Sequence, residues 1–203
     1  MTMTPRKVYL DNSATTKVDS KVLEAMLPYF SEEYGNPNSL HAWGREARKG
    51  VDHARAQVAQ LIGADPKEII FTGGGSEADN LAIKGAAWAL KDKGKHIITS
   101  AIEHHALLDT VKWLGKNGYE YTILPVDETG LVDPKELEAA IRPDTILASI
   151  MFANNEIGTI QPVAELGEVC RRHGVLFHTD GVQATGHVKI DMKELPIDMM
   201  TMA

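Results

Sequence analysis

Residues 145–180 read TILASIMFANNEIGTIQPVAELGEVCRRHGVLFHTD, and they show the pattern that indicates the fold class most clearly. An apolar run, Thr145–Phe152, is followed by the helix-length segment Pro162–His173. Gly174 comes where that helix should end, and a second apolar run, Val175–His178, follows it. Two apolar strands joined through a helix form a βαβ unit, in which the strands are parallel and covered on both faces.

The same alternation continues on both sides of this unit, with strand starts at intervals of roughly 25 to 30 residues. Asp133 before Pro134, with Glu136 three residues after the aspartate, predicts a capping box at one helix start. We therefore predict an α/β protein with a mainly parallel sheet flanked by helices. The other expected strands are Glu68–Phe71, His96–Ser100, Tyr121–Val126 and Ile197–Met202, and the other helices are Glu77–Leu90, His105–Asn117 and Pro134–Ile141.

The first 65 residues follow a different pattern. They hold an extended arm (YLDNSATT, 9–16), a helix near Ser20–Phe30, a polar turn (YGNPNS, 34–39) and a long helix near Ala42–Ile62. We expect residues 1–65 to pack on a sheet domain formed by residues 66–203. Because the sequence stops at the end of an expected strand, we also expect this domain to be incomplete at its C-terminus.

The composition excludes several classes of protein. Hydrophobic residues make up 43% and charged residues 24%, as in ordinary globular domains, so disordered and fibrous classes are excluded. A net charge of −7 argues against nucleic acid as a main partner. One cysteine excludes a disulfide framework and favours a reducing compartment. No signal peptide or membrane span is recognisable, so we expect a cytoplasmic protein.

Loops that follow parallel strands meet at the carboxyl edge of the sheet, where α/β proteins bind ligands. The first such loop, residues 72–76, is a glycine turn that opens a helix. Backbone amides near Gly75 and the hydroxyl of Ser76 could bind a phosphate group at the helix N-terminus. The glycine turn matches neither a Walker loop nor a dinucleotide-binding fingerprint. The alternative to phosphate binding is a turn with no ligand.

Four polar side chains follow the later strands. His104 could stack on a flat ligand or transfer protons, or it could only cap a helix; adjacent His105 diverges from it, so the two cannot share a metal. Asp180 follows an apolar strand, where a carboxylate needs a cation such as a protonated pyridine nitrogen, or serves as a helix cap. Asn155 and Gln183 could bind a phenolate oxygen or be structural. Together these groups describe a site for a phosphorylated pyridine.

Six motifs of the sequence are YLDNSATT (9–16), YGNPNS (34–39), FTGGGSEADNLAIKG (71–85), EHHA (103–106), NNEIGTIQP (154–162) and HTDGVQATGHVKID (178–191). Together they resemble the NifS/IscS-like cysteine desulfurases. The resemblance implies the large domain of a fold-type I transferase that depends on pyridoxal 5'-phosphate. It implies a homodimer that removes sulfur from L-cysteine, gives L-alanine and passes a persulfide to an iron–sulfur scaffold protein or another sulfur acceptor. Nucleic acid, membrane and metal are not among the expected partners.

The resemblance also implies roles for single residues. His104 would stack on the cofactor ring and assist proton transfers, and Asp180 would keep the pyridine nitrogen protonated. Gly75 and Ser76 would bind the phosphate group. The ring hydroxyl would be bound by Gln183 and Asn155, the latter also lying near the substrate carboxylate.

Other residues of the resembling family have no counterpart in this sequence. The Schiff-base lysine of that family follows the last expected strand in a Ser-x-His-Lys motif, and Ala203 stands where the serine would be, so a phosphate contact there would use the backbone. The persulfide cysteine and the substrate-binding arginine are also missing. Cys170 lies inside an expected helix, which favours a structural role. We therefore expect the 203-residue chain by itself to be inactive.

Two alternatives stay open at this point. The intact protein could be another pyridoxal-phosphate enzyme of the same fold, such as an aminotransferase or a selenocysteine lyase, because a fold does not determine an activity. The chain could also be a non-catalytic binding module.

Overall fold

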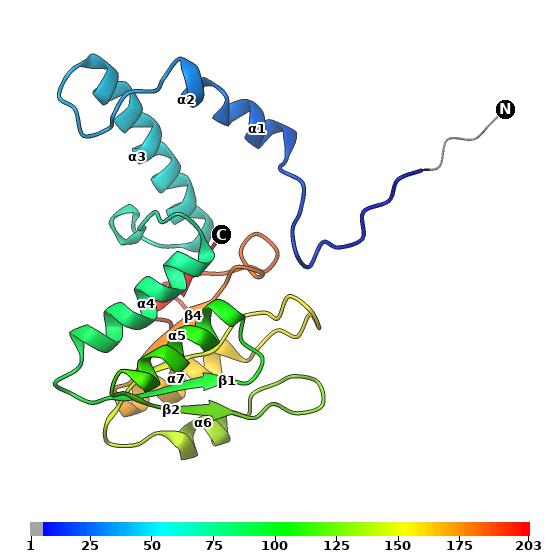
Figure 1. Ribbon diagram of the computed structural model, residues 1–203, viewed down its shortest axis with the longest axis vertical. Coiled ribbons are helices and arrows are strands. Elements are labelled where there is room, and N and C mark those ends of the chain that lie inside the picture. The colour runs from blue at the N-terminus through cyan, green and yellow to red at the C-terminus, as the bar shows by residue number, and fades with distance from the viewer. Residues whose placement is uncertain (1–5) are drawn as a thin grey trace. The chain divides into compact units, whose positions relative to one another are not determined.

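The computed structural model describes residues 6–203, which divide into two compact units between Gln57 and Val58. The first unit contains α1 (Ser20–Met26), α2 (Pro28–Ser31) and most of α3 (Ala42–Ile62) (Figure 1). The sequence predicted one helix over Ser20–Phe30. Two helices form instead, because Pro28 has no N–H with which to continue α1 and begins a new helix. The packing of residues 1–65 on the sheet domain stays a prediction.

The second unit contains a five-stranded sheet in which every pair of neighbouring strands is parallel. The order across the sheet is β2-β1-β3-β4-β5. The predicted α/β fold with a parallel sheet is confirmed, and the observed strands are shorter than predicted at some ends. They are β1 (His96–Ser100), β2 (Glu120–Leu124), β3 (Thr145–Ser149), β4 (Leu176–Asp180) and β5 (Met199–Thr201).

Helices cover both faces of this sheet. On one face, Ile97 of β1 packs with Ile83 and Leu107 from two helices. On the other face, the neighbouring Ile98 joins a cluster with Leu166, since successive strand residues point to opposite sides. The apolar strands are thus buried on both sides, as a parallel sheet requires. The four helices are α4 (Gly75–Ala89) and α5 (His105–Lys116) on the first face, and α6 (Pro134–Ala140) and α7 (Val163–His173) on the second.

The predicted strand Glu68–Phe71 is wrong. Residues Pro66–Glu68 form a short 3-10 turn closed by a capping box. The Asp65 carboxylate accepts the Lys67 N–H at 2.8 Å, and the Glu68 carboxylate accepts the Asp65 N–H at 2.8 Å. This local turn takes the residue that would have started the strand.

Helix ends follow their sequence signals in most cases. Asp133 caps α6 by accepting the Lys135 N–H at 2.8 Å, but Glu136 does not complete the predicted capping box within the described chain. Gly174 ends α7 in the left-handed conformation with φ of 66°, as expected for a glycine at this position. Among residues 6–203, no helix is both long and apolar enough to cross a lipid bilayer.

Candidate functional site

The strand order places a topological switch point between β1 and β3. These strands are neighbours in the sheet, although β2 lies between them in the sequence. From β1 the chain continues to β2 on one side of this pair, and from β3 it continues to β4 on the other side. Such a point is where doubly wound sheets bind ligands. The loop after β1 carries His104, and the loop after β3 carries Asn155.

His104 is the N-cap of α5. Its ring Nδ1 accepts the Ala106 N–H at 3.2 Å, and the side chain is exposed. The rings of His104 and His105 have centroids 6.5 Å apart and planes inclined at 64°, so they do not face a common point. The structure thus confirms the capping role, and it leaves the exposed ring of His104 able to contact a ligand.

Asp180 is the last residue of β4 and is only 5% exposed. One carboxylate oxygen accepts the Val182 N–H at 3.0 Å. Burial raises the pKa of Asp180, while the Val182 N–H and nearby His104 lower it. Within residues 6–203, no lysine or arginine forms an ion pair with this carboxylate. A buried acid in these surroundings suits a cationic ligand atom.

The glycine turn opens α4, whose N-terminus is the predicted phosphate site. Helix α4 begins at Gly75, and Gly74 before it has φ of 154° and no side chain that caps the helix. The first N–H groups of a helix have no partner within that helix. A Cβ at Gly75 would lie 3.1 Å from Val182 Cγ2 and 3.5 Å from the Ala203 Cβ, so the turn meets the chain beyond β4 and β5. The hydroxyl of Ser76 is exposed beside it.

Asn155 and Gln183 keep their side-chain amides available. Asn155 is half-buried, Gln183 is exposed, and neither side chain hydrogen-bonds within the described residues. The neighbouring Asn154 has the structural role instead. Its side-chain Oδ1 accepts the N–H groups of Glu156 at 2.8 Å and Ile157 at 3.0 Å.

A buried histidine and carboxylic acid, which sequence reasoning missed, lie between α4 and β4. His178 Nδ1 lies 2.8 Å from the Ser149 hydroxyl, and Nε2 lies 3.0 Å from the Thr201 hydroxyl. Nε2 is also 4.0 Å from Asp79 Oδ1. Burial and repulsion from Asp180 raise the pKa of Asp79 to about 7, and burial lowers the pKa of His178 to about 3.

A second buried acid, Glu103, also escaped the sequence analysis. Burial raises the pKa of Glu103 to about 8, and repulsion from Asp180 and Asp79 adds to this effect. Two sequence signals point to these acids. Asp79 shares the buried face of α4 with Ile83, and a charge in an apolar stripe is unusual. Glu103 directly precedes His104.

Cys170 is fully buried in α7. Burial raises the pKa of its thiol to about 12, with a further contribution from the charge of Asp198. A thiol of this kind is a poor nucleophile, which supports the structural interpretation.

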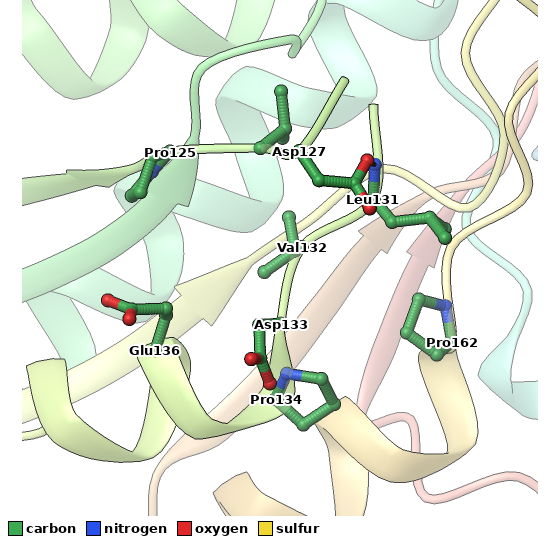
Figure 2. A pocket seen from close by; sticks show the side chains of 9 residues that line it. Pro125, Asp127, Leu131, Val132, Asp133, Pro134, Glu136 and Pro162 are labelled. Atoms are coloured by element: carbon green, nitrogen blue, oxygen red, sulfur yellow. Dashed lines mark hydrogen bonds between the residues drawn. The ribbon is translucent and has the colours of Figure 1, made fainter. Parts of the chain in front are cut away.

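A surface hollow lies apart from the predicted site residues. Figure 2 shows it between the end of β2 and the start of α6, with a proline-rich lining and three acidic residues. None of the candidate site residues lines it. The lining residues are Pro125, Val126, Asp127, Leu131, Val132, Asp133, Pro134, Glu136 and Pro162.

Fold and site together define a doubly wound α/β protein whose polar groups gather at the carboxyl edge of a parallel sheet. The aminotransferase class-V family matches residues 8–203, and the chain belongs to that family. It is 57% identical over 198 residues to the cysteine desulfurase IscS of Methanosarcina thermophila, covering 98% of this chain and 49% of the relative. It is 53% identical over 197 residues to a putative cysteine desulfurase IscS 1 of Bacillus subtilis, covering 97% of this chain and 52% of the relative.

Solved structures agree with this assignment. A NifS-like protein superposes with a TM-score of 0.93 at 41% identity, covering 97% of this chain and 55% of its own. SspA in complex with cysteine superposes with a TM-score of 0.91 at 40% identity, covering 94% of this chain and 55% of its own. The resemblance to NifS/IscS-like proteins is confirmed. The chain spans about half the length of the curated relatives it matches.

Proposed function

We propose that the full-length protein is a pyridoxal-phosphate-dependent cysteine desulfurase. Overall, L-cysteine and a protein thiol would give L-alanine and a persulfide. The observation that carries this proposal is the 57% identity to a cysteine desulfurase over nearly the whole chain. A structural relative that holds cysteine supports the choice of substrate.

The residues present fit pyridoxal phosphate at three points. The uncapped start of α4 and the hydroxyl of Ser76 suit a phosphate group. The buried carboxylate of Asp180 suits a protonated ring nitrogen. The amides of Asn155 and Gln183 suit the ring hydroxyl. The donor set therefore matches the phosphate, the nitrogen and the hydroxyl of one cofactor.

When bound, pyridoxal phosphate supplies an electron sink for negative charge that develops on the substrate. In our proposal, Asp180 holds a proton on the ring nitrogen, and His104 stacks on the ring and moves protons to and from the substrate. Gly75 and Ser76 bind the phosphate, with a backbone contact from Ala203. Asn155 contributes to binding the substrate carboxylate.

The proposal extends to the setting of the reaction. It includes a homodimer, a cytoplasmic location and delivery of sulfur to an iron–sulfur scaffold protein or another acceptor. These parts are supported by the family to which the chain belongs.

The test uses the full-length protein purified with pyridoxal phosphate. We expect a visible absorbance band from bound cofactor, and stoichiometric alanine from L-cysteine in the presence of a thiol. Bound cofactor without alanine, combined with amino-group transfer to a keto acid, would identify an aminotransferase. Alanine from selenocysteine but not from cysteine would identify a selenocysteine lyase. No bound cofactor would contradict the whole proposal.

A further inference from the structure

Two buried side chains connect the loops that follow β1 and β3. From the β1 side, Glu103 Oε1 accepts the N–H of Met151, beyond β3, at 2.9 Å. The same oxygen accepts the hydroxyl of Ser100 at the end of β1. From the β3 side, Asn154 Nδ2 donates to the Ile102 carbonyl at 2.9 Å. The two loops are therefore tied together in both directions.

The amide of Asn154 also organises its own loop. Its Oδ1 accepts the N–H groups of Glu156 and Ile157, which fixes the turn that contains Asn155. Its Nδ2 reaches the loop that contains His104. One planar group thus relates the positions of two candidate cofactor contacts that lie far apart in the sequence.

Because these groups are buried, loss of their hydrogen bonds should cost free energy of folding. Glu103 is 6% exposed and Asn154 is 9% exposed. Without Glu103, the Met151 N–H would be a buried donor without this acceptor, and such a group costs more than the bond itself is worth. Burial, and to a lesser extent the nearby Asp180 and Asp79, disfavour the charged form of Glu103. Its carboxyl group nevertheless forms hydrogen bonds to Ser100 and to Met151.

We propose that Glu103 and Asn154 are positioning residues that set His104 and Asn155 relative to each other at the switch point between β1 and β3. They act through hydrogen bonds to the two loops and do not themselves contact the cofactor. This inference rests on the proposed function, in which His104 and Asn155 contact the cofactor. The hydrogen bonds of Glu103 and Asn154 join residues of this chain and do not involve the cofactor.

The first test compares two buried amides with the same chemical change. Asn154→Asp keeps the oxygen that caps the turn and removes the donor to Ile102. Gln161→Glu is the matched control, because Gln161 is 3% exposed and also bridges two loops. It donates to Gly130 at 2.6 Å and accepts from Val132 at 2.9 Å, away from His104.

Both variants are made in the full-length protein, with two measurements. The first is the dissociation constant of pyridoxal phosphate, and the second is the imidazole ¹⁵N chemical shifts of His104 in the cofactor-free protein. For Asn154→Asp we expect the dissociation constant to rise about tenfold, as for loss of one buried hydrogen bond, and the His104 signals to move. For Gln161→Glu we expect a change below about twofold and unmoved His104 signals.

A second pair of variants separates geometry from charge at Glu103. Glu103→Gln keeps the accepting oxygen and is expected to retain the wild-type His104 signals. Glu103→Ala removes that oxygen and is expected to move them and to weaken cofactor binding about tenfold. If Glu103→Ala does not fold, Glu103→Asp, one methylene shorter, is expected to move the His104 signals in its place.

The outcomes distinguish this inference from the proposed function. If wild-type protein binds no pyridoxal phosphate, the proposed function fails, while the His104 signals still test the positioning role. If the cofactor binds but Asn154→Asp behaves like Gln161→Glu, the positioning inference is overturned. Equal His104 signals in Glu103→Ala and wild type would overturn it as well.

Discussion

Asp180 and Gln183 lie three positions apart after β4 but in different environments. Asp180 is buried and accepts a backbone N–H, whereas the amide of Gln183 is exposed to solvent. A charged group in a buried site interacts more strongly with a ligand than a neutral, hydrated one does. The two side chains should therefore differ in how much they contribute to cofactor chemistry.

The first prediction concerns this pair. In the full-length protein, Asp180→Ala should lower the rate of alanine formation at least about tenfold more than Gln183→Ala, because a charged partner is lost in one case and a neutral hydrogen bond in the other. Rates are measured at saturating pyridoxal phosphate. Similar residual rates would contradict the roles proposed for the two residues.

The second prediction concerns the pH dependence of stability at Asp79. Its pKa is raised from 3.8 to about 7 by burial and by Asp180. Between these values the folded state holds a proton that the unfolded state has lost, so this group stabilises the fold at low pH and its contribution falls as pH rises through 7. Asp79→Asn lacks this titration. Relative to wild type, its free energy of unfolding should rise by on the order of 1 kcal/mol per pH unit across that window.

Urea unfolding at several pH values between 4 and 8 measures this difference. Asp19→Asn is a suitable control, because Asp19 is exposed and caps α1. A constant difference between Asp79→Asn and wild type across the range would show that Asp79 is ionised in the folded protein at all these pH values.

The third prediction concerns Cys170. Its buried thiol, with a pKa of about 12, should resist alkylation in the native full-length protein and react once the protein is unfolded in urea. Cys170→Ala should change the rate of alanine formation less than about twofold, which fits a group outside the site. Mass mapping of the Cys170 peptide measures both labelling and persulfide content. A persulfide on Cys170 during turnover would contradict its structural role.

Among the helices and strands, the sequence predicted element ends correctly where a single local signal was present. Gly174 and Asp133 mark helix ends where they were expected. Residues 68–71 were misinterpreted, because the apolar run resembles a strand while the capping box at Asp65 forms a turn just before it. Pro28 likewise divided a helix whose apolar pattern continues across it. Errors occurred where two local signals competed for the same residues.

The fourth prediction compares two glycines in helical segments. An added Cβ would meet no atom within 4 Å at Gly174 or at Gly85, so packing does not enter the comparison. Gly174 has φ of 66°, which an alanine adopts only with strain, whereas Gly85 lies inside α4. Gly174→Ala should destabilise the protein by about 1 kcal/mol, and Gly85→Ala should stabilise it by about 0.5 kcal/mol. Thermal unfolding of the full-length variants measures both, and shifts of the same sign would contradict the backbone explanation.

The order of the strands in the complete sheet brings the candidate site residues together. The sequence alone could place His104, Asn155 and Asp180 at strand ends, and parallel strands then put those ends on one edge. It could not reveal the roles of Glu103 and Asn154. Their partners lie 48 and 52 positions away, and the strand order that makes them neighbours follows from packing of the complete sheet.

The fifth prediction concerns protection of the sheet. β1 and β3 have every residue buried and a strand on each side, whereas β2 lies at one side of the order and is largely exposed. In the full-length protein, backbone amides of β2 should exchange with deuterium roughly tenfold faster than those of β3. Peptide-level hydrogen exchange measures this, and equal protection of the two strands would contradict the observed order.

The adjacency of β1 and β3 also has a consequence for biosynthesis. The loop that holds His104 leaves the ribosome well before the segment that anchors it, and β2 and α6 must be made in between. The hydrogen bonds of Glu103 and Asn154 can form only after β2, α6 and β3 have been synthesised, since long loops must close before distant contacts form. During synthesis, the apolar β1 strand therefore lacks its neighbour β3 for an interval, and an unpaired apolar strand favours aggregation of a nascent chain.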